Sequence, residues 1–259
     1  MKLFNLNIGI KIDNNSGVID LINNDKYDIV TLQESMRKID DCVKLKYDSC
    51  NEIKKQTNYK NDFYGALWFA KQHIKNGNVE KDFGGLVEQG NQLLTNFLIV
   101  KSRNVFYYLK YSKFEDVTNF RKDDHPRAFV DVILKIKDKQ LQIINIHGCW
   151  NKDKTGNERT LMQTQAILDN VRFDIPSIVV GDFNLLPDTK EIKLLSEKMD
   201  NLIEKFNIKS TRPDFDDGLD KGNMVCDYIF INDKVKVNDF KVLNSDVSDH
   251  MPLVLDFDI

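Results

Sequence analysis

The G-D-F-N sequence at residues 181–184 places a carboxylate and an amide directly after the apolar residues 178–180. Side chains two residues apart on an extended chain point to the same side, so Asp182 and Asn184 can face one spot. A carboxylate and an amide at one spot are groups that a hydrolytic site uses. Gly, Asp and Asn also form turns, so a plain strand-to-loop turn is the alternative explanation.

A second group of acids and a base lies near the end of the sequence, where Asp249 and His250 precede the apolar residues 253–257. Adjacent side chains on an extended segment point in opposite directions, so Asp249 is badly placed to orient His250. Asp227, which precedes the apolar residues 228–231, is the best other acid. We predict its carboxylate within about 2.6–3.2 Å of one ring nitrogen of His250, which leaves Asp249 free for a metal. The alternative is that Asp249 and His250 are surface residues with only a structural role.

Glu34 follows residues 28–33, which are predicted to form a buried strand, and Asn145 and His147 share one face at the end of residues 141–147. Magnesium prefers hard oxygen ligands from one or two carboxylates, completed by water and phosphate. The four histidines are widely spread and no H-E-x-x-H sequence occurs, which argues against zinc. The sequence therefore predicts a Mg²⁺ site, with Mn²⁺ as a substitute.

The elements that must position these residues begin with a β-α-β unit. Phe4, Leu6 and Ile8 alternate with two asparagines and predict a strand, Ser16 is expected to cap a helix to about residue 24, and residues 28–33 predict a buried strand that ends at Glu34. Further strands are predicted at 64–70, 93–100, 105–109, 128–136, 141–147, 177–180, 228–231, 235–242 and 253–257, with helices before residue 55, at 158–171 and after residue 187.

The short connection at residues 137–139 predicts an antiparallel hairpin, which a purely parallel sheet would not contain. Helices that alternate with both hairpins and crossovers indicate an α/β fold of two mixed, mainly antiparallel sheets packed face to face, with helices outside. Each candidate residue stands at a predicted strand end, where ligand sites commonly form.

Composition suits one domain over residues 1–259, because the chain is 41% hydrophobic and has no repeat or linker. No stretch approaches the ~18 apolar residues of a membrane span, and no basic, apolar leader precedes the first strand. We expect a cytoplasmic monomer without a membrane span. The four cysteines form no C-x-x-C pair and are expected to be reduced, with a Cys42–Cys50 disulfide as the alternative.

The formal net charge is −3 and the pI about 5.9, whereas a nucleic-acid-binding domain usually has a pI above ~9. This argues only weakly against a nucleic-acid substrate, because bound cations would offset the candidate site acids.

The order of these groups along the chain resembles the endonuclease/exonuclease/phosphatase superfamily of deoxyribonuclease I-like phosphoesterases. The resemblance rests on Asn7, Glu34, N-x-H at 145–147, G-D-F-N at 181–184, D-Y-I-F at 227–230 and S-D-H at 248–250. Gly90 and Asn91 look like that family's G-N segment, so the resemblance covers essentially the whole chain. It implies a four-layer α-β-β-α sandwich and metal-dependent hydrolysis of a P–O bond.

The resemblance also implies roles for the matching residues. Glu34 would hold Mg²⁺ with help from Asn7 and Asp249. Asp182 would orient or deprotonate the attacking water, and Asn184 would contact the phosphoryl oxygens.

His250, braced by Asp227, would stabilise or protonate the transition state. His147 matches the second histidine of the deoxyribonuclease I, sphingomyelinase and tyrosyl-DNA phosphodiesterase branches, and it argues against the abasic-site repair branch, in which a tyrosine stands there. Asn91 and Asn145 are expected to help bind the substrate.

Two departures from the family pattern concern charge. Asn7 is followed by Ile8 and Gly9 where the repair branch often has N-x-D-G, so one ligand is missing. Many relatives carry Arg at the position of Val225, and the charge could come instead from Arg127, a candidate substrate contact, or from Arg212. A solvated or salt-bridged surface role is the alternative for both.

Aromatic residues near basic ones suggest contacts with the substrate. Trp150, in the loop at 148–157 after His147, could stack on a base or sugar or act as a hydrophobic plug. Residues 101–113 could track single-stranded nucleic acid, or form an ordinary strand with half-buried aromatics. We expect a phosphodiesterase acting on a nucleic-acid end or a small nucleotide-like diester. The alternatives are a phosphomonoesterase, a phospholipid phosphodiesterase, or a binding module without catalysis.

Overall fold

Two β-sheets form the body of the protein, whose computed structural model describes residues 1–259 apart from 10–14, 76, 115–124 and 214–223. The first sheet contains β1 (Lys2–Asn7), β2 (Ile29–Lys38), β3 (Asn61–Lys75), β4 (Asn78–Thr95), β6 (Ser112–Lys113), β12 (Lys236–Val242) and β13 (Leu253–Asp258). Its strand order is β12-β13-β1-β2-β4-β3-β6. The β1 and β2 strands are parallel and are joined by a helix, as the predicted β-α-β unit requires.

The second sheet contains β5 (Leu98–Tyr108), β7 (Arg127–Ile136), β8 (Lys139–His147), β9 (Ser177–Asp182), β10 (Asp200–Asn201) and β11 (Asp227–Ile231). Its order is β10-β11-β9-β8-β7-β5. The β7 and β8 strands form the predicted antiparallel hairpin, whereas β8 and β9 run parallel. Both sheets are therefore mixed.

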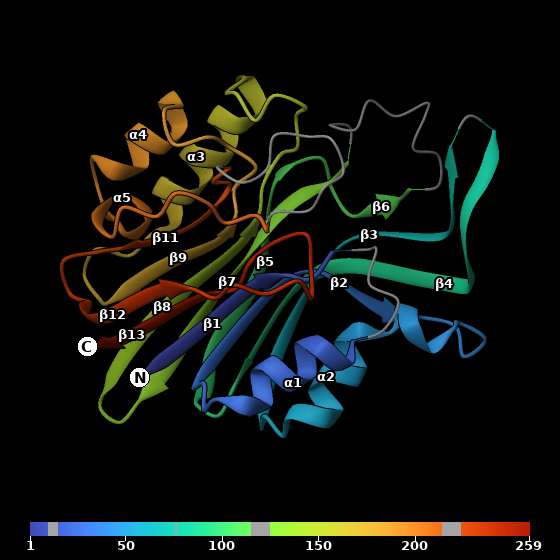
Figure 1. Ribbon diagram of the computed structural model, residues 1–259, viewed down its shortest axis with the longest axis horizontal. Helices are drawn as coiled ribbons and strands as arrows, with labels where there is room; N and C mark the ends of the chain where they lie inside the picture. The colour runs from blue at the N-terminus through green and yellow to red at the C-terminus, as the bar shows by residue number, and fades with distance from the viewer. Residues whose placement is uncertain (10–14, 76, 115–124, 214–223) are drawn as a thin grey trace.

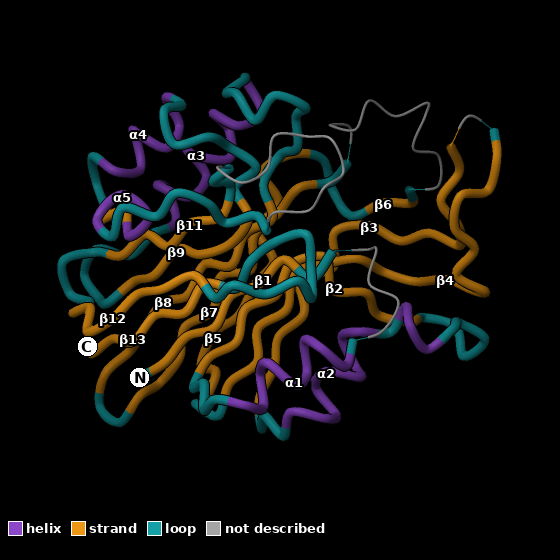
Figure 2. Tube along the Cα trace, in the orientation of Figure 1, coloured by secondary structure: helices purple, strands orange, loops and turns teal. Residues whose placement is uncertain are grey.

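Helices cover the outer face of each sheet, which makes four layers (Figures 1 and 2). The first sheet is covered by α1 (Ser16–Asn24) and α2 (Ser49–Thr57), which a short helical turn, η1 (Leu45–Tyr47), precedes. The second sheet is covered by α3 (Glu158–Asn170), α4 (Lys190–Ser196) and α5 (Leu202–Lys205). The predicted α-β-β-α sandwich is confirmed. None of the described helices combines the length and apolar character needed to cross a membrane.

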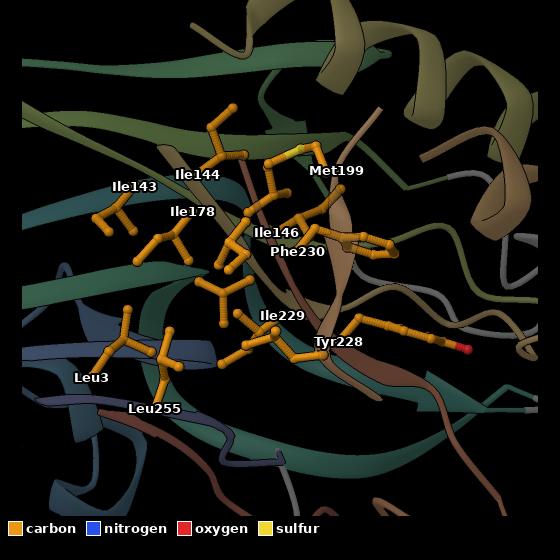
Figure 3. Packing of buried hydrophobic residues seen from close by; sticks show 14 of the residues in the cluster. Leu3, Ile143, Ile144, Ile146, Ile178, Met199, Tyr228, Ile229, Phe230 and Leu255 are labelled. Carbon is orange, nitrogen blue, oxygen red and sulfur yellow. The ribbon is translucent and has the colours of Figure 1, made fainter. Parts of the chain in front are cut away.

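The largest hydrophobic core joins the two sheets and extends under the second layer of helices. Leu3 and Leu255 from the first sheet pack with Ile143, Ile178 and other apolar residues of the second, as Figure 3 shows. A separate cluster beneath α1 and α2 contains Val18, Ile22 and Ile53. Burying apolar surface contributes roughly 25 cal/mol per Å², so these cores hold the strand ends in fixed relative positions.

A polar network crosses the interface between the sheets. The Gln33 amide donates to Asn5 Oδ1 at 2.8 Å and to Asn145 Oδ1 at 2.6 Å. The Asn145 amide in turn donates to the backbone oxygens of Leu32 and Gln92 at 3.1 and 2.9 Å. Because buried polar groups must be paired, this network fixes how the sheets register against each other.

The predicted boundaries that were wrong include those at the start of α1, within residues 93–100 and at Glu34. Asn15, not Ser16, is the N-cap residue of α1, and its side chain makes no capping bond. Residues 93–100 are two strands, because the chain turns at residues 96–97 and passes from the first sheet to the second. The Thr95 hydroxyl stabilises that turn by accepting from Phe97 N at 3.1 Å. Glu34 does not end its strand, since β2 continues to Lys38.

All four cysteines are free, and Cys42 is exposed whereas Cys50 is buried. The alternative of a disulfide between these two residues is therefore not formed in the structure.

Candidate active site

The polar residues predicted from the sequence converge where strands of both sheets end. His147 lies opposite Asp182 in the parallel pair β8–β9, and Asp227 lies opposite Asp182 in the antiparallel pair β9–β11. Asn7 ends β1 in the other sheet and its amide donates to Asp182 Oδ2 at 3.0 Å. Strand pairing therefore places the side chains of His147, Asp182 and Asp227 in one row, and the packing of the two sheets adds Asn7.

Glu34 enters the site through a bulge within β2. The register of β2 against β4 shifts between Leu32 and Ser35, and Glu34 has a left-handed backbone with a φ of 59°. Bulges re-aim a side chain without ending the strand. The Glu34 Oε1 atom accepts from Asn7 Nδ2 at 3.3 Å and lies 3.6 Å from His147 Nε2.

Asp182 is the centre of the site. Its Oδ1 accepts from the backbone nitrogen of Asn184 at 2.8 Å, and its Oδ2 accepts from the Asn184 amide at 3.1 Å. The Nε2 atoms of His250 and His147 lie 3.6 and 3.8 Å from the same Oδ2. The predicted convergence of Asp182 and Asn184 is thus present.

The predicted pairing of His250 with Asp227 is confirmed. Both oxygens of Asp227 lie 2.9 Å from Nδ1 of His250, and Nε2 faces Asp182. Burial disfavours the imidazolium, but the charges of Asp227 and Asp182 prevail and hold the pKa of His250 well above its usual value. These carboxylates therefore favour the positively charged form of His250.

Thr211 is a residue of the site that sequence reasoning missed. Its hydroxyl donates to Asp227 Oδ2 at 2.7 Å and accepts from the backbone nitrogen of Cys226 at 3.2 Å. The side chain is fully buried. The available signal was its position next to Arg212.

Asp249 binds Arg212, whose Nη2 donates to Asp249 Oδ2 at 2.8 Å. Burial opposes ionisation, but the charges of His250 and Arg212 lower the pKa of the Asp249 carboxyl below its usual value. Arg212 is one of the two arginines that could supply the charge missing at Val225. It reaches the site through Asp249, whose negative charge it balances.

Burial raises the pKa of Glu34, and the neighbouring charges of Asp249 and Asp182 raise it further. Burial, followed by the nearby charge of Arg127, lowers the pKa of His147 to about 3. The imidazole of His147 is therefore neutral at neutral pH, and its Nδ1 has no hydrogen-bond partner among the described residues. Arg127 itself is 5% exposed, and its Nε is also without a partner.

Comparison with known proteins agrees with this geometry. A model of the Endonuclease/Exonuclease/phosphatase family matches residues 3–250. The chain belongs to this family. Its members are phosphoesterases.

Solved structures of this family share the fold. An endonuclease/exonuclease/phosphatase from Beutenbergia cavernae DSM 12333 superposes with a TM-score of 0.75 at 15% identity, over 99% of this chain and 71% of that one. A mannosyl-6-phosphatase from Bacteroides thetaiotaomicron VPI-5482 gives 0.67 at 15% identity, over all of both chains. The human Nocturnin catalytic domain with bound sulfate gives 0.66 at 18% identity, over 100% and 94%. A comparison with curated protein sequences gave no significant match.

Among the described residues, one group of side chains lies close enough together to hold a cation. Ligand atoms of Asp182, Cys226, Asp227 and His250 lie within 4.8 Å of one another. Burial raises the pKa of the Cys226 thiol to about 11, however, and His250 is already bonded to Asp227, so this cluster is better described as a hydrogen-bonded acid–base group. Glu34, Asp182 and Asp249 also carry the hard oxygens that Mg²⁺ prefers, and the pKa of the Glu34 carboxyl is raised mainly by burial and further by the charges of the other two acids.

Three predicted assignments require correction. Asn7 directs its amide nitrogen at both carboxylates while its Oδ1 accepts from Gly9 N at 3.0 Å, so in this orientation it positions the acids and offers them no ligand oxygen. Asn145 is fully buried and bonded between the sheets, so it has no access to a substrate. Asn91 is likewise fully buried and donates to the backbone oxygen of Ala128 at 3.3 Å.

The basic and aromatic residues of 101–113 mostly belong to β5, where they contact neighbouring elements. Arg103 pairs with Asp131, and Arg159 of α3 lies 4.7 Å from the ring centroid of Tyr108. These contacts favour the ordinary strand over a track for nucleic acid. Trp150 is partly exposed, and Lys154 lies 5.4 Å from the centroid of its ring.

Proposed function

We propose that the protein is a magnesium-dependent phosphodiesterase, which hydrolyses a P–O bond by in-line attack of water. The observation that carries this proposal is the arrangement around Asp182. Its Oδ2 lies within 3.8 Å of the Nε2 atoms of a charged and a neutral histidine, and it accepts from two amides. Such a centre can bind a water molecule and a phosphoryl group at the same time.

Glu34 and Asp249, with Asp182 nearby, are the residues that would hold Mg²⁺. When bound, the ion would supply Lewis-acid polarisation of the phosphoryl group. Asp182 would orient the attacking water and accept its proton. Its tight bonding to Asn7 and Asn184 fixes the carboxylate before the substrate arrives, which lowers the cost of reorganisation during the reaction.

The two histidines would have different roles in the same reaction. His250 is charged and is held by Asp227, so its Nε2–H can donate to the developing charge or to the leaving oxygen. His147 is neutral and, with the Asn184 amide, would bind the phosphoryl oxygens. The substrate we propose is a nucleic-acid end or a small nucleotide-like diester.

A phosphomonoesterase of the same fold is the second candidate. It is favoured by the structural similarity to a protein described as a mannosyl-6-phosphatase. The chemistry of water attack is common to both, so the residue roles do not change.

Hydrolysis of bis-p-nitrophenyl phosphate and p-nitrophenyl phosphate, each with Mg²⁺ and with EDTA, tests the proposal. We expect the diester to be cleaved faster and EDTA to abolish turnover, with Mg²⁺ or Mn²⁺ restoring it. Glu34→Gln should raise the Mg²⁺ concentration for half-maximal rate, because it removes a ligand charge and keeps the shape. Full activity in EDTA contradicts the metal assignment, and a preference for the monoester favours the second candidate.

The four free cysteines suit a reducing compartment, and we propose that the enzyme acts in the cytoplasm. That it acts as a monomer stays a prediction.

A further inference from the structure

The loop at residues 148–157 is anchored against the segment that carries Asp182 and Asn184. The backbone nitrogen of Gly148 donates to Asp182 O at 2.7 Å, and that of Leu186 donates to Lys154 O at 2.9 Å. A Cβ atom at Gly148 would meet the backbone oxygen of Phe183 at 2.3 Å, so this approach is as close as a glycine permits. The loop therefore holds Lys154 at a defined place beside the site.

The ammonium of Lys154 points into the site. It donates to Oδ1 of Asn184, and it lies 5.4 Å from the ring centroid of Trp150, which favours a cation there. Its charge is also among those that lower the pKa of His147, which places it near that imidazole. Lys154 thus lies close to the two groups to which we assign binding of the phosphoryl oxygens.

Lys154 offers a cation beside Asn184. Val225 is apolar and buried, Arg212 is engaged by Asp249, and Arg127 is buried near His147. An ammonium carries three donors, of which Asn184 takes one. By binding Oδ1 of Asn184, Lys154 also directs the Asn184 amide nitrogen toward Asp182, which it reaches at 3.1 Å.

We propose that Lys154 is a further catalytic residue, whose ammonium binds the non-bridging oxygens of the phosphoryl group while it orients Asn184. This inference rests on the proposed function. Charge accumulates on these oxygens as the P–O bond breaks, so the contact strengthens in the transition state. No covalent step involves the lysine.

Three variants test this role: Lys154→Met, Lys154→Arg and Lys152→Met. Methionine keeps an apolar stem and removes the charge, whereas Lys152 is an exposed lysine of the same loop and serves as the matched control. We expect Lys154→Met to lose roughly 10²- to 10³-fold in kcat with a smaller change in KM, since a donor to an oxyanion is worth about that factor. Lys154→Arg should recover part of the loss, and Lys152→Met should match the wild type.

Calorimetric binding of inorganic phosphate in the presence of Mg²⁺ separates this inference from the proposed function. We expect Lys154→Met to bind phosphate at least about tenfold more weakly than the wild type, and Lys152→Met to bind it as the wild type does. The wild type and these two variants should unfold at the same temperature. Equal phosphate affinity of the wild type and Lys154→Met overturns the role of Lys154. A wild type that binds phosphate but cleaves neither nitrophenyl ester overturns the proposed function instead.

Discussion

The two histidines of the site share Asp182 as a neighbour and still differ in charge. His147 has Arg127 nearby and no partner on Nδ1, so burial dominates and its pKa falls to about 3. His250 has a second carboxylate at 2.9 Å, which outweighs burial and raises its pKa. Environments that separate the pKa values of like groups suit them to different roles, which agrees with the roles proposed above for His250 and His147.

Replacing Asp227 by asparagine tests this separation. An amide cannot balance the imidazolium, so the pKa of His250 should fall and kcat should decrease by roughly 10²- to 10⁴-fold, with the fold and Mg²⁺ binding retained. Steady-state kinetics and a nuclear magnetic resonance titration of the imidazole measure the two effects. A loss below about tenfold with an unchanged pKa would show that Asp227 has only a structural role. His250→Ala, measured alongside, should lose a similar factor.

At the scale of elements, the site depends on how closely β8 and β9 approach. Gly181 has a φ of 140°, and a Cβ there would meet the backbone oxygen of Ile146 at 2.0 Å. The glycine of G-D-F-N is therefore required by packing, one residue before the central carboxylate.

Gly181→Ala should lower the free energy of unfolding by about 3 kcal/mol or more, because strand backbone must move to admit the methyl group. Gly77→Ala is the matched control, since Gly77 also has a positive φ of 75° but nothing within 4 Å of its Cβ, and it should cost only about 1 kcal/mol. Urea unfolding of both variants measures the difference. Similar losses for the two would mean that backbone conformation, not the contact with Ile146, requires the glycine.

Most strands and the order of the site groups could be predicted from the sequence, because period-2 patterns and strand ends are local features. The bulge that aims Glu34 could not, since it depends on how β2 registers against β4. Thr211 and Lys154 lie in loops whose paths are set by distant backbone contacts, such as Leu186 with Lys154. Asn145 was mistaken for a substrate contact because its partners, Gln33 and Gln92, are remote in sequence.

At the scale of the whole molecule, Asn145 joins the two sheets beneath the site. Asn145→Ala would leave two buried backbone oxygens and the Gln33 amide with fewer partners. We expect a loss of roughly 2–5 kcal/mol in unfolding free energy with KM little changed at low temperature, because each unpaired buried group costs about 1–3 kcal/mol. Denaturant unfolding and steady-state kinetics measure both. A raised KM with normal stability would restore Asn145 as a substrate contact.

The pairing of β1 with β13 joins segments from opposite ends of the described chain, and the amino group of Met1 donates to Phe257 O at 2.7 Å. Asn7 is the last residue of β1 and His250 precedes β13, so the site needs both strands. During synthesis, β1 leaves the ribosome long before β13, and until then one edge of β1 has no strand to pair with. The growing chain therefore has no assembled site until β13 has been released and has paired with β1.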